Sequence, residues 1–196
     1  PKKNFKFLGC HIQANLGWKM QVDETVKKMR RGAARIRLEG RNVGTQERKT
    51  LYYAWVHSHI MCNAGAYLPL LGTNHKQELQ TAANAGIRAI CRLPKRGQVP
   101  VSSIREQLKI PSVETACLRV RWSEAWKRKP TTCTMDQAGP TTRGRAAGNV
   151  PTPDLRGWNG KRIEILALAT WNELPADVKI ETDRKKAMTM IKKILS

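Results

Sequence analysis

Apolar residues recur at helical spacing near the start of this 196-residue chain. Val22, Val26, Met29, Ala33 and Ile36 are separated by four, three, four and three positions, which keeps them on one side of an α-helix. The cations between them are predicted to face away from that side, with Lys28, Arg31 and Arg35 opposite it and Lys27 and Arg30 on its flanks. The pattern therefore predicts a helix over residues 22–38, with one face for a protein core and a strongly basic opposite face.

The residues before this helix follow the two-residue period of a β-strand. Phe5 and Phe7 are separated by one lysine, Gly9 permits a bend, and Ile12 continues the extended pattern. We therefore expect a short β-hairpin within residues 1–20.

Four further stretches before residue 130 have the patterns of helices. A second helix is predicted from Thr45 to near Gly65, and it is apolar around almost the whole circumference over residues 51–56 and 60–62, which predicts a helix buried in a bundle. Residues 73–93 carry many alanines and a glycine, whose small size would let a neighbouring helix approach closely. Shorter helices are predicted over residues 101–108 and 113–129.

Residues at the expected helix starts are of the types that stabilise the N-terminal end of a helix. Asp23 and Glu24 fall in the first turn of the first predicted helix, where negative charge complements the helix dipole. Thr45 is a candidate N-cap for the second helix, and Thr73 or Asn74 for the third.

The composition changes after residue 129. Pro, Thr, Gly and Arg dominate residues 130–160, which predicts a linker or a segment that becomes ordered on a partner. Helical periodicity returns over residues 161–196. The expected fold is therefore mainly α: a β-hairpin in residues 1–20, a helical bundle in residues 21–129, the irregular Pro/Gly/Arg-rich segment, and a C-terminal helical pair.

The charge of the chain changes the functional picture. Thirty-six Lys and Arg against fifteen Asp and Glu give a net charge of +21, whereas a magnitude of about 2–8 suffices for solubility. A polyanionic partner explains such a surplus best, and nucleic acid is the first candidate. A solvated basic surface and an anionic membrane surface are the alternatives. No apolar run approaches the ~20 residues of a membrane span, so we expect no membrane partner.

The cysteines point to a reducing environment. They are five in number, lie far apart and form no Cys-x-x-Cys pair. We interpret them as reduced, mostly buried thiols of an intracellular protein. They are Cys10, Cys62, Cys91, Cys117 and Cys133.

Signatures of catalysis are missing from the pattern. Nucleotidyl transfer needs two carboxylates that hold metal ions, and the adjacent pair Asp23-Glu24 is better explained by its place in a helix. Phosphate-binding glycine loops are absent. His57, His59 and Cys62 are a weak zinc candidate without a fourth ligand, and packing or RNA contact is the preferred interpretation. We therefore predict no catalytic residue, metal or cofactor.

The remaining chemistry is that of nucleic-acid backbone contact, in which lysine and arginine bind phosphates without reading sequence. Arg143 and Arg145 suit an RNA backbone, with a solvated linker as the other interpretation. Trp158 could stack on a base, whereas the other tryptophans mostly fall on apolar helical faces. The candidate nucleic-acid-binding residues are Lys2, Lys3, Lys6, Lys27, Lys28, Arg30, Arg31, Arg35, Arg41, Lys95, Arg96, Arg119, Lys127, Arg128, Lys129, Arg143, Arg145 and Trp158.

Five short motifs follow one another in a characteristic order. They are Lys6-Phe7-Leu8-Gly9-Cys10-His11-Ile12, Asn15-Leu16-Gly17-Trp18 with the helix after it, residues 51–66, residues 78–94, and Trp171-Asn172-Glu173-Leu174-Pro175. Together they resemble the carboxyl-terminal part of reverse transcriptases from non-LTR (LINE-type) retrotransposons. The first looks like the hairpin that grips the primer, the third and fourth are similar to helices of the thumb, and the last matches a Trp-Asn-x-Leu-Pro signature.

This resemblance implies a helical thumb that holds a template–primer duplex by its backbone. The catalytic aspartates of the palm would lie upstream of Pro1, so the chain by itself should not polymerise DNA. RNA is the expected partner, and an RNA/DNA hybrid or DNA is left open. A retroelement protein would act in the nucleus or cytoplasm.

A second hypothesis explains the same features. A retroelement thumb without its palm could be a domesticated RNA-binding subunit of a ribosome, including a mitochondrial one, or of another ribonucleoprotein, with other proteins of that particle as partners. A purely structural helical module is a third hypothesis, and it leaves the charge unexplained.

Overall fold

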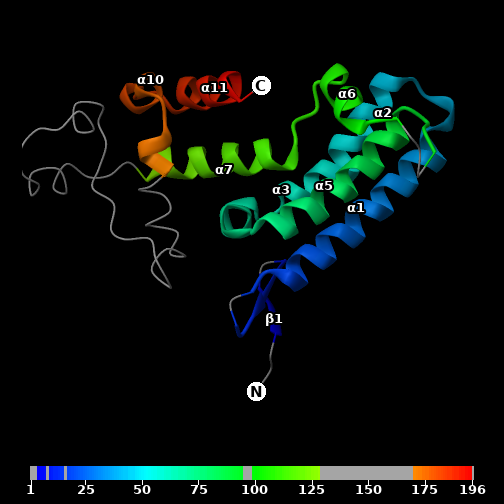
Figure 1. Ribbon diagram of the computed structural model, residues 1–196, viewed down its shortest axis with the longest axis horizontal. Helices are drawn as coiled ribbons and strands as arrows, with labels where there is room; N and C mark the ends of the chain where they lie inside the picture. The colour runs from blue at the N-terminus through cyan, green and yellow to red at the C-terminus, as the bar shows by residue number, and fades with distance from the viewer. Residues whose placement is uncertain (1–3, 8, 16, 95–98, 129–169, 196) are drawn as a thin grey trace, which may run out of the picture. The chain divides into compact units, whose positions relative to one another are not determined.

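The computed structural model describes residues 4–7, 9–15, 17–94, 99–128 and 170–195 (Figure 1). This part of the chain is mainly helical, with an N-terminal β-hairpin and C-terminal helices, as the sequence predicts. It divides into two compact units, the first formed by Pro1–Tyr67 with Leu71–Glu114 and the second by Leu68–Leu70 with Thr115–Ser196. The predicted irregular segment and the boundaries set at residues 130 and 160 lie outside the described residues.

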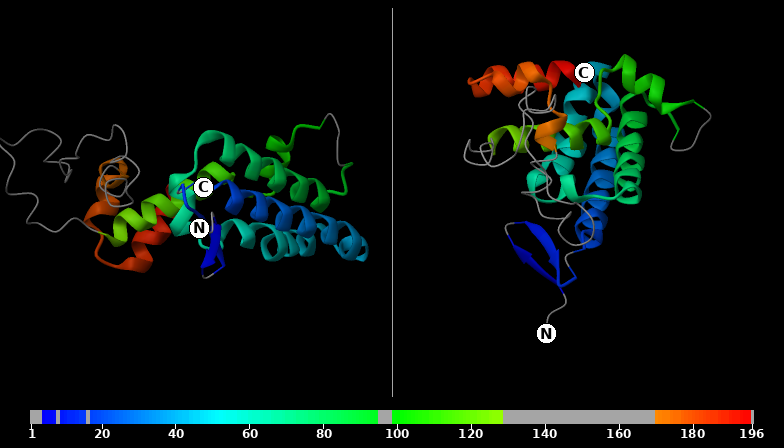
Figure 2. Two further views of the ribbon diagram at one scale, coloured as in Figure 1. Left: turned by 90° about the horizontal axis from the view of Figure 1, so that it is seen from below. Right: turned by 60° about the vertical axis from the view of Figure 1, so that its left-hand side comes forward.

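Strands β1 (Asn4–Phe7) and β2 (Cys10–Gln13) form the expected antiparallel hairpin. Phe5 lies opposite Ile12, and Gly9 turns the chain with a φ of 81°, a conformation that glycine adopts without steric cost. The hairpin lies at the N-terminal end of the first helix (Figure 2). The backbone N–H of His11 donates to Gln21 Oε1 at 2.9 Å, which fixes the hairpin to that helix.

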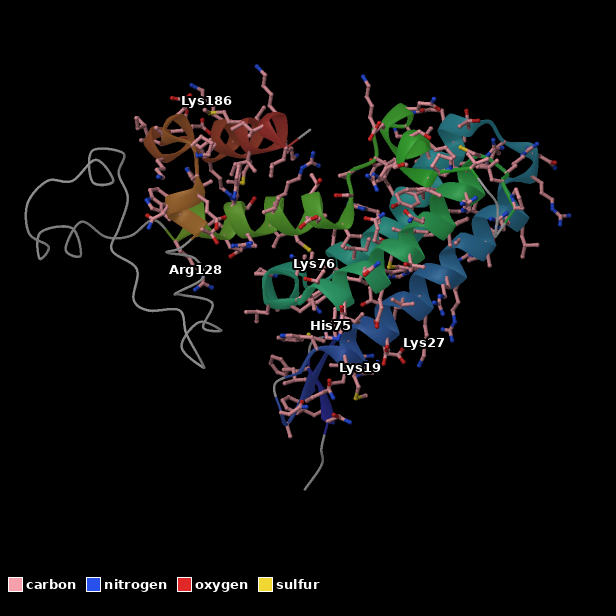
Figure 3. The ribbon with its side chains drawn as sticks, in the orientation of Figure 1. Lys19, Lys27, His75, Lys76, Arg128 and Lys186 are labelled. Carbon is pink, nitrogen blue, oxygen red and sulfur yellow. The ribbon has the colours of Figure 1, made fainter. Side chains whose placement is uncertain are left out.

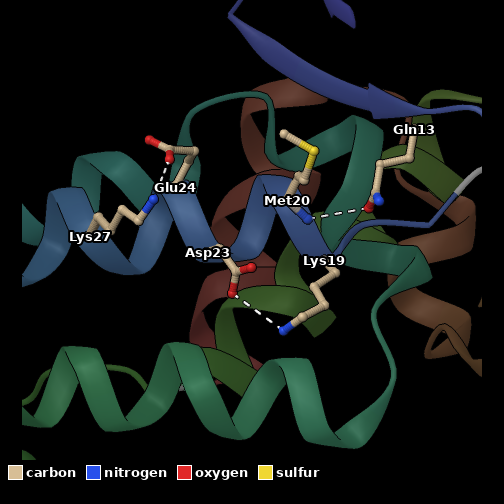
Figure 4. Close-up of polar contacts among 6 residues, drawn as sticks. All are labelled: Gln13, Lys19, Met20, Asp23, Glu24 and Lys27. Carbon is tan, nitrogen blue, oxygen red and sulfur yellow. Dashed lines mark hydrogen bonds and ion pairs between the residues drawn. The ribbon is translucent and has the colours of Figure 1, made fainter. Parts of the chain in front are cut away.

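Helix α1 (Lys19–Glu39) buries the predicted apolar stripe, including Val22, Met29 and Ile36. It begins three residues earlier than predicted, because Gln13 Oε1 of the hairpin accepts a hydrogen bond from the N–H of Met20, at the unsatisfied end of the helix (Figure 4). The prediction that Asp23 and Glu24 occupy the first turn is therefore wrong.

The second predicted helix is one continuous stretch with a wider turn inside it. A 3₁₀ turn η1 (Gly40–Asn42) precedes α2 (Thr45–Tyr52), the π-helical η2 (Tyr53–His57) and α3 (Ser58–Met61). Gly44 is its N-cap, so the prediction for Thr45 is wrong by one residue. The stretch ends at Met61 rather than near Gly65, and the short α4 (Ala64–Tyr67) and η3 (Leu68–Leu70) follow it.

This stretch is buried on one face only, contrary to the prediction of burial all round. Tyr52, Val56 and Ile60 are buried, whereas Ala54 and Met61 are exposed. The three buried residues are four positions apart and share a face, and they pack against neighbouring helices of the first unit. Apolar composition alone does not distinguish such a face from the rest of the circumference.

Helix α5 (Thr73–Ile90) lies alongside α1 (Figure 1). Its predicted small residues do allow a close approach: a Cβ at Gly86 would lie 2.9 Å from the ring of Tyr52. The N-cap is Gly72 instead of Thr73 or Asn74. The helix also ends before Leu93, because Arg92 adopts a positive φ of 56°.

Arg48 is buried in the first unit and joins the ends of three helical segments. Its side chain is 6% exposed. The guanidinium donates to the carbonyl oxygens of Ile90 at 2.6 Å, Val43 at 2.5 Å and Gly40 at 3.4 Å, and to Thr45 Oγ1 at 3.1 Å. It thereby satisfies carbonyl groups that the C-terminal ends of α1 and α5 leave without helical partners.

We expect Arg48→Met to lower the free energy of unfolding by about 3 kcal/mol, because it leaves several buried carbonyl groups without donors, and hydrogen bonds to charged groups are worth about 1.5–3 kcal/mol each. Urea unfolding measures the loss. The control is Lys49→Met on the same helix, whose side chain makes no hydrogen bond or ion pair to another described residue. Equal losses in the two variants would contradict the role of Arg48.

The first unit ends with one short helix and the start of the next. Helix α6 (Val101–Gln107) is the predicted short helix, and α7 (Val113–Lys127) follows it. The backbone N–H of Val113 donates to Gln80 Oε1 at 2.8 Å, which ties the start of α7 to α5. The boundary between the two units falls within the first turn of α7.

The second unit packs the end of α7 against the C-terminal residues. Residues 170–173 are helical, and this helix ends before Leu174. The short α10 (Ala176–Ile180) was not predicted as a helix, and α11 (Arg184–Ile194) is the predicted last one. The indole N–H of Trp126 donates to the carbonyl of Val178 at 3.1 Å. The core comprises Ala125, Trp126, Trp171, Leu174, Val178, Ala187 and Ile191.

The cysteines are free thiols in the described part of the chain, and their burial varies. Cys10 and Cys117 are buried, Cys91 is half-buried and Cys62 is exposed, so the expected burial holds for only part of the set. Burial raises the pKa of the Cys10 thiol, and neighbouring Cys62 raises it further. Cys133 lies outside the described residues. No described helix has the length and apolar content needed to cross a membrane.

Candidate nucleic-acid interface

The predicted cations of α1 are all exposed. Lys27, Lys28, Arg30, Arg31 and Arg35 occupy positions of the helix that the core does not cover, and Figure 3 shows Lys27 on its outer side. The opposite face carries the buried apolar stripe. The helix therefore presents cations to solvent while its other side is held by the first unit.

The arrangement of these cations differs in detail from the prediction. At about 3.6 residues per turn, Lys27 and Arg31 lie farthest from the buried stripe. Lys28 and Arg35, which the sequence placed opposite the core, lie instead on the flank that faces η2 and α3. The guanidinium of Arg35 stacks over the ring of Trp55, 4.4 Å from its centroid.

Three carboxylates neutralise part of this face. Glu24 pairs with Lys27 at 2.8 Å and Glu39 with Arg35 at 3.1 Å, while Asp23 pairs with Lys19 at 3.6 Å (Figure 4). Exposed pairs of this kind contribute only about 0–1 kcal/mol, so a phosphate could displace the carboxylate.

Three other exposed cations of α1 lack an ion-pair partner among the described residues. Lys28, Arg30 and Arg31 form no ion pair with another described residue, and we call these three residues the α1 triad. Helix α1 as a whole holds seven cations and three acids. The triad is therefore the part of α1 most available to an anionic partner.

His59 lies close enough to Lys28 to sense its charge. Burial lowers the pKa of His59 below its ordinary value of 6.5, and the positive charge of Lys28 lowers it further. The unfolded chain therefore binds a proton at His59 more readily than the folded chain as the pH falls through about 6.5. The contribution of His59 to stability is complete above that pH and is lost as the pH falls through the folded pKa.

We expect His59→Gln to remove this component of the pH dependence, so that the variant loses less stability than the wild type between pH 7 and pH 5. Urea unfolding of both proteins across this range measures the difference. A polyanion at Lys28 should raise the pKa of His59, which an NMR titration of its ring would detect. A ring pKa that stays the same with and without RNA would contradict contact at this position.

The hairpin adds one described cation and two aromatic rings. Lys6 is exposed on β1, and Phe5 and Phe7 beside it are 54% and 59% exposed. Exposed rings of this kind can stack on bases. Sequence reasoning used these phenylalanines only as a strand pattern and missed their exposure, since an alternating pattern does not show which face is covered.

The other predicted residues fall into different environments. Arg41 is exposed after α1, and Arg128 is exposed after α7. Lys127 is paired with Glu124 at 2.7 Å. Arg119 is half-buried and donates to the carbonyl of Leu195 at 3.1 Å, so we correct its assignment from the interface to packing in the second unit. Lys2, Lys3, Lys95, Arg96, Lys129, Arg143, Arg145 and Trp158 lie outside the described residues.

One exposed cationic segment was not among the predicted sites. Helix α11 buries Ala187 and Ile191 and exposes all of its lysines and arginines. Its amphipathic spacing was visible in the sequence and could have placed it among the candidates. These cations are Arg184, Lys185, Lys186, Lys192 and Lys193.

The described ranges contain no metal-binding cluster. No three His, Cys, Asp or Glu side chains gather there closely enough to hold a metal ion, and His57, His59 and Cys62 form no such group. In comparisons with known proteins, no family model, curated protein or solved structure matches this chain.

Proposed function

We propose that this chain binds nucleic acid through its phosphate backbone, with RNA as the first partner, and that the exposed face of α1 is a principal contact. One observation carries the proposal: α1 holds six exposed cations on a helix whose opposite face is buried, and three of them have no ion pair with a described residue. A rigid helix of this kind offers charge to a polyanion without disturbing the core.

The charge of the whole chain supports the same partner. A net charge of +21 attracts a polyanion to the protein from a distance, and added salt shortens the range of this attraction. Lysine and arginine contacts to phosphate give affinity and register without sequence preference. The proposal is therefore binding by backbone and shape, and not a catalytic activity of this chain by itself.

A retroelement origin remains part of the proposal. The resemblance to the thumb of a non-LTR reverse transcriptase would make a template–primer duplex the partner, and a backbone contact through α1 is compatible with RNA or with an RNA/DNA hybrid. The same contact would serve a subunit of a ribonucleoprotein.

The experiment that tests the proposal measures the affinity of the full chain for one duplex sequence made as RNA, as RNA/DNA hybrid and as DNA, over a series of salt concentrations. Each phosphate contact contributes a slope of about −0.9 in the logarithm of affinity against the logarithm of salt. We expect a slope of about −3 or steeper for the preferred duplex. The preferred duplex identifies the partner.

Vesicles of anionic phospholipid provide the control in the same buffer. Weak binding to vesicles together with steep, salt-dependent binding to a duplex supports the proposal. Absence of duplex binding at about 0.1 M salt, or a stronger interaction with vesicles, would overturn it.

A further inference from the structure

Four arginines line one small pocket in the first unit. Arg37, Arg41, Arg48 and Arg92 surround a space of about 130 Å³ between the C-terminal ends of α1 and α5. The other lining residues are small or apolar, and no aspartate or glutamate is among them. We call these four residues the arginine pocket.

Backbone carbonyls hold three of the four arginines in place, namely Arg37, Arg48 and Arg92. Arg48 uses its donors on four oxygen atoms, as described above. Arg37 donates from Nη1 to the carbonyl of Leu93 at 2.8 Å, and Arg92 donates from Nη2 to the carbonyl of Arg41. A guanidinium has five N–H donors, so Arg37 and Arg92 keep donors beyond these bonds.

Helix capping explains only part of this arrangement. The C-terminal ends of helices attract cations, which accounts for Arg37, Arg48 and Arg92. The side chain of Arg41 makes no hydrogen bond or ion pair to another described residue. Arg48 is buried, yet all of its hydrogen-bond partners are neutral, whereas buried charges are ordinarily paired with an opposite charge.

An anion in the pocket would supply the missing charge. One water needs about 10–15 Å³ of such space, so the pocket has room for a phosphate group and accompanying water. Guanidinium groups bind phosphate in a bidentate manner, with directed N–H donors. We propose that the arginine pocket binds a phosphate group, with Arg37 as the fixed donor, the buried positive charge of Arg48 beside it, and Arg41 and Arg92 at its mouth.

The position of the pocket adds a second contact to the proposed binding of nucleic acid. That the phosphate belongs to a nucleic acid rests on the proposed function. Arg37 lies seven residues after Arg30 of the α1 triad, about two helical turns and roughly 10 Å along the axis at 1.5 Å per residue, so both side chains start from the same side of α1. A nucleic-acid strand that crosses the α1 triad could therefore place one of its phosphates in the pocket. A terminal phosphate of such a strand is the other source of the same chemistry.

The test titrates the full chain with inorganic phosphate against chloride at constant ionic strength, with binding followed by calorimetry. The pocket variant combines Arg41→Gln with Arg92→Asn, because asparagine tolerates the positive φ at position 92. The control combines Lys49→Gln with Lys109→Asn, which removes the same charge and also replaces a residue at positive φ. Neither control residue lines the pocket.

We expect the pocket variant to bind phosphate at least about tenfold more weakly than the wild type, since it loses charge-assisted hydrogen bonds, and the control to bind within about twofold of it. Phosphate binding no stronger than that of chloride, or equal binding by the wild type and the pocket variant, would overturn the inference. Should the double variant lose its circular dichroism signal, Arg41→Gln alone gives the same test, because Arg41 is exposed.

RNA duplexes with a 5′-hydroxyl or a 5′-phosphate distinguish the two sources. An equal loss of affinity for both in the pocket variant assigns the pocket to an internal phosphodiester, and a loss for the 5′-phosphate duplex alone assigns it to a terminal phosphate. Phosphate binding that depends on Arg41 in a chain that binds no RNA would uphold the pocket and refute the proposed function. RNA binding that depends on the α1 triad, in a protein whose pocket binds no phosphate, would uphold the proposed function and refute the pocket.

Discussion

Replacement of the α1 triad by glutamine (Lys28→Gln, Arg30→Gln and Arg31→Gln together) should weaken binding of an RNA duplex roughly a hundredfold at about 0.15 M salt. Each phosphate contact contributes about −0.9 to the salt slope, and counterion release at this salt makes each contact worth roughly a factor of five. Removal of three contacts should also reduce the magnitude of the slope by about 3. Fluorescence anisotropy over a salt series measures both quantities.

The matched control removes the same charge from scattered positions. Lys49→Gln, Lys76→Gln and Lys109→Gln lie on α2, on α5 and after α6, so they are not gathered on one helix. We expect this control to lose less than about tenfold in affinity. Arg35 is left intact in both proteins because it stacks on Trp55. Equal losses in the two triple variants would show that net charge alone, and not the α1 triad, determines binding.

A large effect on stability is expected from a single methyl group in α1. A Cβ at Gly32 would lie 2.0 Å from the carbonyl oxygen of Trp55 and 2.8 Å from its carbonyl carbon. Both atoms belong to the backbone, so no change of rotamer relieves the clash. The two helical segments must move apart, and this also disturbs the contact of Trp55 with Arg35 on the surface.

We therefore expect Gly32→Ala to lower the free energy of unfolding by at least about 2 kcal/mol. Overpacking costs about 1–3 kcal/mol and occasionally more, and the better helix propensity of alanine returns only about 1 kcal/mol. Urea unfolding measures the change. Gly72→Ala is the control, because a Cβ there meets no atom within 4 Å, and its effect should stay within about 1 kcal/mol. A Gly32→Ala protein as stable as the wild type would contradict this packing.

Local periodicity was sufficient to predict the elements that bury one face and to say which residues form that face. The spacing of Val22, Met29 and Ile36 identified the buried side of α1, and the alternation around Phe5 identified the hairpin. Helix starts were less predictable, because α1 begins where the side chain of Gln13, on the preceding hairpin, accepts the N–H of Met20. That hydrogen bond depends on how the hairpin meets the helix, and the helix sequence does not indicate it.

The roles of individual arginines could not be predicted from charge. Arg31 and Arg48 look alike in sequence, yet Arg31 is exposed and Arg48 is buried against the carbonyl of Ile90, forty-two positions away. Arg119 was taken as a phosphate contact and is bound instead to the carbonyl of Leu195. Only the tertiary arrangement separates cations that hold the fold from cations that remain for a partner.

An NMR titration of the full chain with an RNA duplex tests the central claim most directly, since it reports on each backbone amide without any mutation. The account predicts that the amides around Lys28, Arg30 and Arg31 shift progressively as RNA is added, and that the shifts reverse when salt is raised. Amides of the buried core, such as those of Val56 and Ile87, should change little. A complex in which RNA binds and the amides of residues 27–35 keep their free positions would contradict it.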